Sequence, residues 1–165
     1  MSSRGPRIVP WPIERFDEIW PIIEEVAEGE DTYALPGKLT REEAHEIWSE
    51  PGRKIYAAFI NDEICGTYYL RPNQPGPGDH VANAGFMVPQ KSRGVGIARL
   101  MGTHALSEAK RLGYRSMQFN FVVSTNAPAI RLWRSLGFEV VGTLPNAFRH
   151  RQLGLVDAYV MYREL

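Results

Sequence analysis

The chain has 165 residues, of which 44% are hydrophobic and 23% charged, a composition typical of globular proteins with enough length to bury a core. Nineteen Lys and Arg residues balance nineteen Asp and Glu residues, so no overall positive field would attract nucleic acid or an acidic membrane. Cys65 is the only cysteine, which excludes an internal disulfide and a multi-cysteine metal site.

No run of 18 apolar residues and no signal-peptide core occurs in the sequence. The lone cysteine also suits a reducing compartment. We therefore expect a cytoplasmic protein, with residues 1–165 forming one domain.

Two helices are predicted near the N-terminus, after a short strand at residues 8–9. Apolar residues at helical spacing predict the first helix over residues 13–27, and Pro21 should kink it or restart it. Thr40 and Glu43 have the spacing of a capping box and should open the second helix.

The rest of the chain predicts strands and helices in an order that implies a mixed sheet. Expected strands cover residues 55–60, 64–70, 81–88, 117–123 and 156–162, with another beginning at 140, and expected helices cover 97–112 and 127–136. The segments 72–79 and 145–154 contain prolines and glycines and are expected to be loops. A strand, crossover helix and strand predict a parallel pair, whereas hairpins predict antiparallel pairs. We therefore predict an α/β (α+β) protein with about seven strands in a mixed, twisted sheet and helices on both faces.

A basic, glycine-containing turn connects the predicted strand at 81–88 to the following helix. It reads Arg93-Gly94-Val95-Gly96-Ile97-Ala98, and its glycines let the backbone approach a ligand closely. A strand, glycine turn and helix present free N–H groups and a positive helix terminus to an anion such as a phosphate. The spacing fits neither a Walker loop nor a dinucleotide fingerprint. A turn of this kind without any ligand fits the residues equally well.

The glycine turn and the order of elements resemble those of the GNAT superfamily of acyl-CoA-dependent N-acetyltransferases. A second block, from Asn126 to Phe138, resembles the asparagine-to-Gly-Phe motif of that family. Three shorter stretches, Asn83-Ala84-Gly85-Phe86, Leu100-Met101-Gly102 and Phe119-Asn120, resemble members that acetylate proline analogues such as azetidine-2-carboxylate. The resemblance implies a GNAT fold whose fourth and fifth strands splay apart.

The resemblance also implies acetyl-CoA as co-substrate and no metal. Amides from Gly94 to Arg99 would hold the CoA pyrophosphate. The backbone of Met87 and Val88 would pair with the pantetheine arm, and an N–H assigned to Val88 would polarise the thioester carbonyl. The residues with an implied cofactor contact are Met87, Val88, Lys91, Arg93, Gly94, Val95, Gly96, Ile97, Ala98, Arg99, Asn126, Ala129 and Trp133.

Two of these residues also have simpler structural explanations. Asn126 is a plausible helix N-cap, and Trp133 fits the core better than a ligand contact. Asn83 differs, because an asparagine inside an apolar strand must find polar partners. We assign Asn83 and Asn120 to orienting the acceptor or the thioester, since an amide both donates and accepts hydrogen bonds. His104 fits a buried, hydrogen-bonded position.

The sequence departs from the family pattern at two catalytic positions. The strand at 81–88 contains no carboxylate that could act as a base, and Trp133 occupies the position of the usual acidic tyrosine. His80 and His150 are the remaining candidates for a proton relay. Neutralising a lysine amine at pH 7 costs about 4–5 kcal/mol, whereas an α-amine near pKa 8 costs about 1.4 kcal/mol. The missing base therefore disfavours an exposed lysine as acceptor, although cyclic imino acids are also basic and would still need a relay.

We expect direct acetyl transfer to the amine of a small molecule such as an amino or imino acid, with proximity and oxyanion stabilisation supplying most of the rate. A protein N-terminus, an antibiotic amine and a non-catalytic acyl-CoA-binding module stay open as alternatives. Neither nucleic acid nor a membrane is expected as a partner, and a homodimer stays open.

Overall fold

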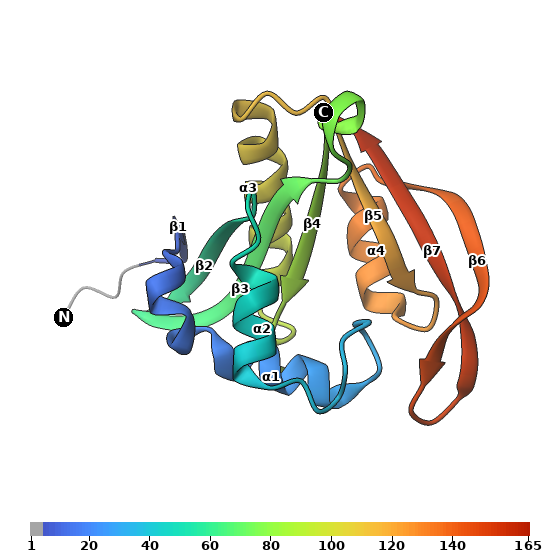
Figure 1. Cartoon of the computed structure of the whole chain (residues 1–165), viewed down its shortest axis with the longest axis horizontal. Helices are drawn as coiled ribbons and strands as arrows, with labels where there is room; N and C mark the ends of the chain where they lie inside the picture. Colours follow the sequence, from blue (N-terminus) through green and yellow to red (C-terminus); the bar gives the residue numbers. More distant parts are fainter. Residues whose placement is uncertain (1–4) are drawn as a thin grey trace.

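The computed structural model describes residues 5–165, which form a seven-stranded sheet in the order β1-β2-β3-β4-β5-β7-β6 (Figure 1). The strands are β1 (Arg7–Pro10), β2 (Lys54–Ile60), β3 (Glu63–Pro72), β4 (Val81–Met87), β5 (Ser116–Val123), β6 (Glu139–His150) and β7 (Gly154–Glu164). The α-helices are α1 (Trp20–Gly29), α2 (Arg41–Trp48), α3 (Ile97–Arg111) and α4 (Ala127–Ser135), and 3-10 turns η1 (Ile13–Glu18), η2 (Gly76–Gly78) and η3 (Gln90–Ser92) complete the elements. Neighbouring strands are antiparallel except β4 and β5, which are parallel. The predicted mixed sheet is confirmed.

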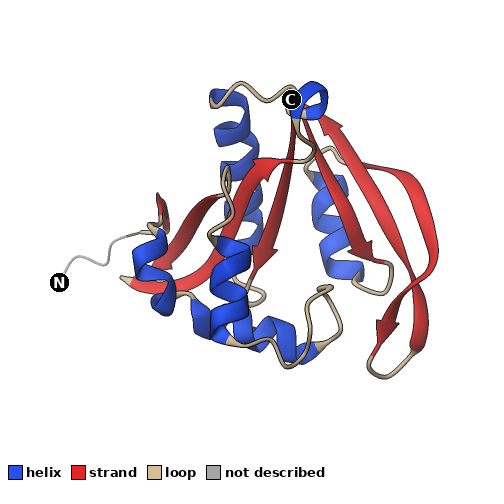
Figure 2. Ribbon diagram, viewed as in Figure 1, coloured by secondary structure: helices blue, strands red, loops and turns tan. Residues whose placement is uncertain are grey.

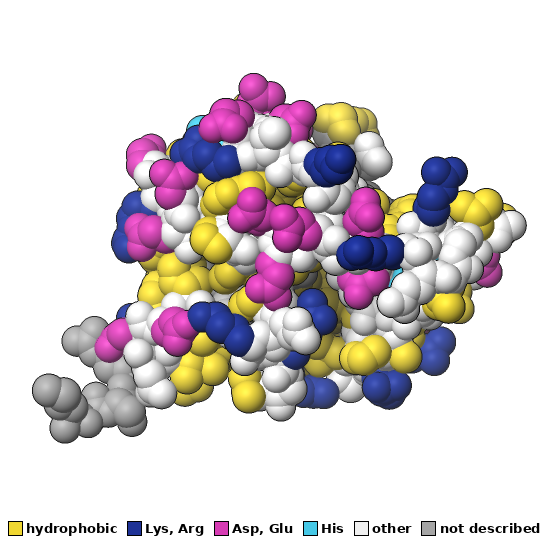
Figure 3. All heavy atoms as spheres, turned by 90° about the horizontal axis from the view of Figure 1, so that it is seen from below, with side chains coloured by type: hydrophobic (Ala, Val, Ile, Leu, Met, Phe, Trp, Pro, Cys, Tyr) yellow, Lys and Arg dark blue, Asp and Glu magenta, His cyan; other side chains and the backbone are white. Residues whose placement is uncertain are grey.

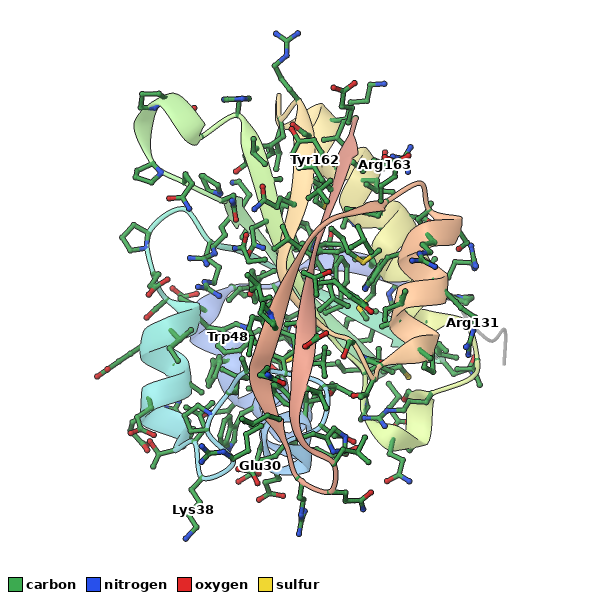
Figure 4. The ribbon with its side chains drawn as sticks, turned by 90° about the vertical axis from the view of Figure 1, so that its right-hand side faces the viewer. Glu30, Lys38, Trp48, Arg131, Tyr162 and Arg163 are labelled. Carbon is green, nitrogen blue, oxygen red and sulfur yellow. The ribbon has the colours of Figure 1, made fainter. Side chains whose placement is uncertain are left out.

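Helices cover both faces of the sheet (Figure 2). Helices α3 and α4 pack on one face, in the same core cluster as Tyr68 and Leu70 of β3. Helices α1 and α2 pack on the other face, in a cluster with Tyr69 of the same strand. This alternation follows from the two-residue period of a strand. Figure 4 shows β6 and β7 from the side, with α2 and α4 on opposite sides of them. No helix within residues 5–165 is long and apolar enough to cross a membrane.

The parallel strands β4 and β5 are in register only at their beginnings. Val81 pairs with Ser116 and Ala82 with Met117, and the ladder ends there. Figure 1 shows the two strands together at one end and apart at the other. The predicted splay of the fourth and fifth strands is therefore confirmed, and it opens from Asn83 onward.

The predicted loop over residues 145–154 is wrong, because strand β6 continues to His150 and only residues 151–153 form the turn. The register with β7 shifts between Leu144 and Phe148, so the extra residues bulge out of the ladder. Asn146 adopts a φ of 52° there, and its N–H donates to Oδ1 of Asp157 at 2.9 Å. A proline is tolerated in this bulge because β6 is an edge strand.

Both predicted helix starts follow local chemistry. The chain restarts at α1 with Pro21 in its first turn, after the separate 3-10 turn η1. Thr40 Oγ1 accepts from Glu43 N–H at 3.2 Å, and Thr40 N–H donates to Glu43 Oε2 at 2.9 Å. The predicted restart and the capping box are thus confirmed.

Candidate active site

A cavity of about 830 Å³ opens where β4 and β5 separate. Its walls come from these two strands, from β3, from the turn before α3 and the first residues of α3, from α4 and the residue before it, and from residues 32–34 between α1 and α2. Figure 1 shows the segment between α1 and α2 crossing below the open end of the two strands. The cavity is large enough for a cofactor arm and a small acceptor to meet inside it.

The glycine turn forms one end of this cavity. Gly94 and Gly96 have φ angles of 78° and 85°, and a Cβ on either would find no atom within 4 Å. The first hydrogen bond from this helix start runs from Leu100 N–H to the Gly96 carbonyl at 3.0 Å, so the preceding amides of the first turn have no intrahelical partner. No side chain caps α3. Together with Arg93 and Arg99 in the same wall, these amides fit a pyrophosphate.

Most of the side chains predicted to contact the cofactor line the cavity, and three do not. Met87 is buried against the core beneath α1 and α2, Lys91 forms an ion pair with Glu63, and Val95 is 64% exposed. Any role of Met87 and Val95 would therefore rest on their backbone atoms. The predicted residues in the walls are Val88, Arg93, Gly94, Gly96, Ile97, Ala98, Arg99, Asn126, Ala129 and Trp133.

Asn126 and Trp133 combine a structural position with a place in the wall. The Asn126 side chain accepts from Ala129 N–H at 3.4 Å and caps α4, so its amide nitrogen is the group that could reach a ligand. Trp133 is 7% exposed and lies 4.8 Å, centroid to centroid, from both Phe86 and Phe119. It is a core residue whose remaining edge faces the cavity.

Asn83 and Asn120 also line the cavity, on opposite sides of the splay. Asn83 Nδ2 donates to the backbone carbonyl of Gln118 at 3.0 Å, one residue beyond the last paired position, so this amide bridges β4 and β5 where their ladder ends. Asn120 accepts from Gln118 Nε2 at 2.9 Å and donates to Asn73 Oδ1 at 2.8 Å.

We call the part of the cavity around Asn83 and Asn120 the acceptor half. Three of its side chains were not predicted from the sequence: Tyr33, Tyr69 and Arg71. The hydroxyls of Tyr33 and Tyr69 lie 3.2 Å apart. Burial is the main cause that raises the pKa of Tyr33 well above its usual value, and the neighbouring Tyr69 raises it further. A Cβ at Gly85 would lie 1.8 Å from the Tyr33 hydroxyl, so only glycine permits this close packing. That glycine inside a strand was the available signal, because it often marks a close approach of other groups.

The loop wall of the cavity is formed by residues 32–34, and no residue of the segment 72–78 lines it. The segment 72–78 reaches the site only through Asn73, which holds the Asn120 side chain.

The ionisable side chains in the cavity wall, over the part of the chain that the structure describes, are tyrosines and arginines, with no Asp, Glu or His. His104 Nδ1 lies 2.6 Å from the Tyr68 hydroxyl on the α3 face, and burial lowers its pKa. His150 Nδ1 accepts from the N–H groups of Gln152 and Leu153 in the β6–β7 turn. His80 precedes β4 and is also outside the wall. Within residues 5–165, no three His, Cys, Asp or Glu side chains are grouped to hold a metal ion.

The acetyltransferase (GNAT) family matches residues 12–138 of this chain. The N-acetyltransferase aca1 of Schizosaccharomyces pombe is 34% identical over 146 residues, covering 78% of this chain and 70% of that protein. The L-amino acid N-acetyltransferase AaaT of Escherichia coli is 28% identical over 123 residues, covering 71% of this chain and 75% of that protein.

Solved structures agree with this match. A GCN5-related N-acetyltransferase from Kribbella flavida superposes with a TM-score of 0.91 at 39% identity over 98% of both chains. The putative acetyltransferase yncA from Salmonella typhimurium, solved with its cofactor acetyl-CoA, has the same fold, with a TM-score of 0.84 at 19% identity over 98% of this chain and 95% of that one. The chain therefore belongs to the GNAT acetyltransferase family and is an acyl-CoA-dependent N-acyltransferase that uses acetyl-CoA as co-substrate.

Proposed function

We propose that this chain acetylates the amine of a small amino or imino acid. The observation that carries the proposal is the character of the acceptor half of the cavity, where Tyr33, Tyr69, Asn83 and Asn120 form a polar wall without an Asp or Glu among the described lining residues. A polycationic antibiotic would find no opposite charge there. The relative AaaT, an L-amino acid N-acetyltransferase, supports the same acceptor class.

Several residues of the cavity wall have proposed roles in this reaction. Bound acetyl-CoA supplies an acyl thioester that an amine can attack. The amides of residues 97–99 bind the pyrophosphate, and the N–H of Val88 donates to the carbonyl oxygen as negative charge develops on it. Asn83 and Asn120 orient the amine. Tyr33 keeps its proton because its pKa is raised, so it can donate a hydrogen bond but cannot act as a base.

The amine itself loses a proton before it attacks, because the described wall holds no carboxylate or imidazole to take it. An α-amine with a pKa near 8 is deprotonated in about a tenth of molecules at pH 7. Cyclic imino acids are more basic, so a smaller fraction of them is present as the attacking free amine and their proton must reach solvent through a relay. The leaving thiolate is only weakly basic, with a thiol pKa of about 8.5, so its departure needs little help from an acid. Proximity and oxyanion stabilisation would therefore provide most of the rate.

Within this class we favour proline analogues such as azetidine-2-carboxylate. The support is the resemblance of Asn83-Ala84-Gly85-Phe86, Leu100-Met101-Gly102 and Phe119-Asn120, and the first and third of these stretches line the cavity.

Release of free CoA thiol from acetyl-CoA, measured over a panel of amines, tests the proposal. We expect turnover with short amino acids and proline analogues, and little with polyamines, aminoglycosides or peptide N-termini. Exclusive acetylation of peptides or aminoglycosides would contradict the acceptor class. Tight acetyl-CoA binding without turnover on any amine would instead favour a non-catalytic acyl-CoA-binding module.

Two further expectations stay predictions. A homodimer is supported by exposed apolar side chains on the β6–β7 hairpin, namely Val141, Leu153 and Leu155. A cytoplasmic location is supported by the sequence features described above.

A further inference from the structure

We propose that Arg71 binds the carboxylate of the acceptor, and that Glu50 and Asn83 hold its guanidinium ready for that contact. This inference rests on the proposed amino- or imino-acid acceptor. It assigns substrate recognition to a residue of β3 that neither the glycine turn nor the asparagine motif contains.

Arg71 lies where the acceptor must be oriented. In the antiparallel register of β3 and β4 it stands directly opposite Asn83, at the point where β4 and β5 separate. Its Nε donates to Asn83 Oδ1 at 3.4 Å, and its side chain lines the cavity. The side chain is 35% exposed, so a ligand in the cavity can reach it.

The positive charge of Arg71 is incompletely neutralised. Glu50 Oε2 lies 2.8 Å from Arg53, whose side chain is only 5% exposed, and 3.7 Å from Arg71. One carboxylate thus serves two guanidinium groups and is closer to Arg53. A charge-assisted hydrogen bond is normally about 2.7–2.9 Å, so the longer contact leaves Arg71 with donors for another carboxylate.

The other cations of the cavity lie elsewhere. Arg93 and Arg99 flank the glycine turn, the end that fits the pyrophosphate, and Arg99 also donates to Ser135 Oγ at 2.9 Å. Among the arginines that line the cavity in the described part of the chain, Arg71 is therefore the one available to the acceptor. A planar guanidinium pairs with a carboxylate through two parallel hydrogen bonds, which fixes both the position and the rotation of an amino acid.

A pair of acceptors that differ only in the carboxylate isolates this contact. Proline and pyrrolidine share the ring and the secondary amine, so the ratio of their kcat/KM values, compared at equal concentrations of free amine, measures carboxylate recognition. We expect Arg71→Gln to reduce this ratio by roughly 100-fold, the size of a lost charged hydrogen bond, while the KM for acetyl-CoA stays unchanged. Arg131→Gln is the matched control, because Arg131 lies on the exposed side of α4 (Figure 4).

A second variant keeps the test decisive if Arg71→Gln folds poorly. Arg71→Lys preserves the charge but loses the paired hydrogen bonds, so the KM for proline should rise by roughly tenfold with the KM for pyrrolidine unchanged. If the Arg71 variants keep the wild-type ratio of kcat/KM for proline to kcat/KM for pyrrolidine, the proposed Arg71 contact is wrong and the proposed function stays intact. A wild-type protein that uses pyrrolidine as well as proline would overturn the inference, because the carboxylate would then go unrecognised. Failure on every amino and imino acid of the panel would overturn the acceptor class and the inference together.

Discussion

Asn83 contacts two neighbouring strands, because it lies between β3 and β5 where β4 and β5 separate. It is 6% exposed, and its amide nitrogen bonds the Gln118 carbonyl across the strands while its oxygen accepts from Arg71. The amide thus ends the pairing of β4 and β5 and supports the side chain that we propose to hold the acceptor.

We expect Asn83→Ala to lower turnover by roughly 10–1000-fold, because one or two polar contacts at the reacting centre are lost, with acetyl-CoA binding little changed. The unpaired Gln118 carbonyl should also reduce the free energy of unfolding by about 1–3 kcal/mol. Steady-state kinetics and urea denaturation measure the two effects separately. Full activity in a folded variant would refute the role of Asn83 in orienting the acceptor.

At the scale of elements, the start of α3 shows how a helix terminus becomes a binding surface. Helix α3 begins after Gly96, which has a left-handed conformation and no side chain to cap the helix. The first-turn amides therefore stay available to a ligand. The other end of the same helix is followed by Gly113, which has a φ of 91° and equally open surroundings.

These two glycines provide a matched pair of variants. Gly96→Val should weaken acetyl-CoA binding by at least about tenfold, because side-chain atoms would enter the proposed pyrophosphate cradle. Gly113→Val imposes similar backbone strain at a place that no ligand is proposed to occupy, so it should lose stability but keep its affinity. Calorimetric titration with acetyl-CoA makes the comparison, and equal affinities in the two variants would remove the turn from the cofactor site.

Over the whole molecule, charges of both signs are distributed without one dominating. Figure 3 shows Lys and Arg intermixed with Asp and Glu on the face seen from below, in keeping with the balanced composition. The cavity departs from this balance, since its described wall contains arginines and no carboxylates. Acid–base behaviour in the reaction should therefore come from the substrate.

We expect kcat/KM to rise about tenfold per pH unit until the pH reaches the pKa of the acceptor amine, because only the free amine attacks. Tyr33, whose pKa is raised, stays protonated over this range and adds no step to the profile. Acceptors with different amine pKa values should shift the plateau accordingly. A plateau near pH 6–7 that is the same for all acceptors would reveal a side-chain base, and His80 and His150 would be replaced first.

Patterns that act over a few residues were readable from the sequence. The capping box at Thr40, the restart at Pro21 and the glycine turn depend on neighbouring residues, and the structure contains all three. The alternation of strands and helices also sufficed for the mixed sheet with its parallel pair, because a crossover helix leaves few alternatives. The splay of that pair was implied by the family resemblance alone. The stretch 145–154 was misread, since a proline that signals a loop is also compatible with a bulge in an edge strand.

The acceptor half of the cavity was decided by tertiary structure. Arg71 meets Asn83 through the register of β3 and β4, Glu50 reaches Arg71 and Arg53 from the end of α2, and Tyr33 lies over Gly85 because residues 32–34 cross the cavity. Arg71, Glu50 and Tyr33 have unremarkable sequence neighbourhoods, so no local pattern indicates their partners. Asn83 and Gly85 do stand out inside their strand, but the strand alone does not say which side chains they meet. The cofactor end uses backbone amides that a short glycine motif exposes, whereas the acceptor end uses side chains that only strand register and loop course bring together.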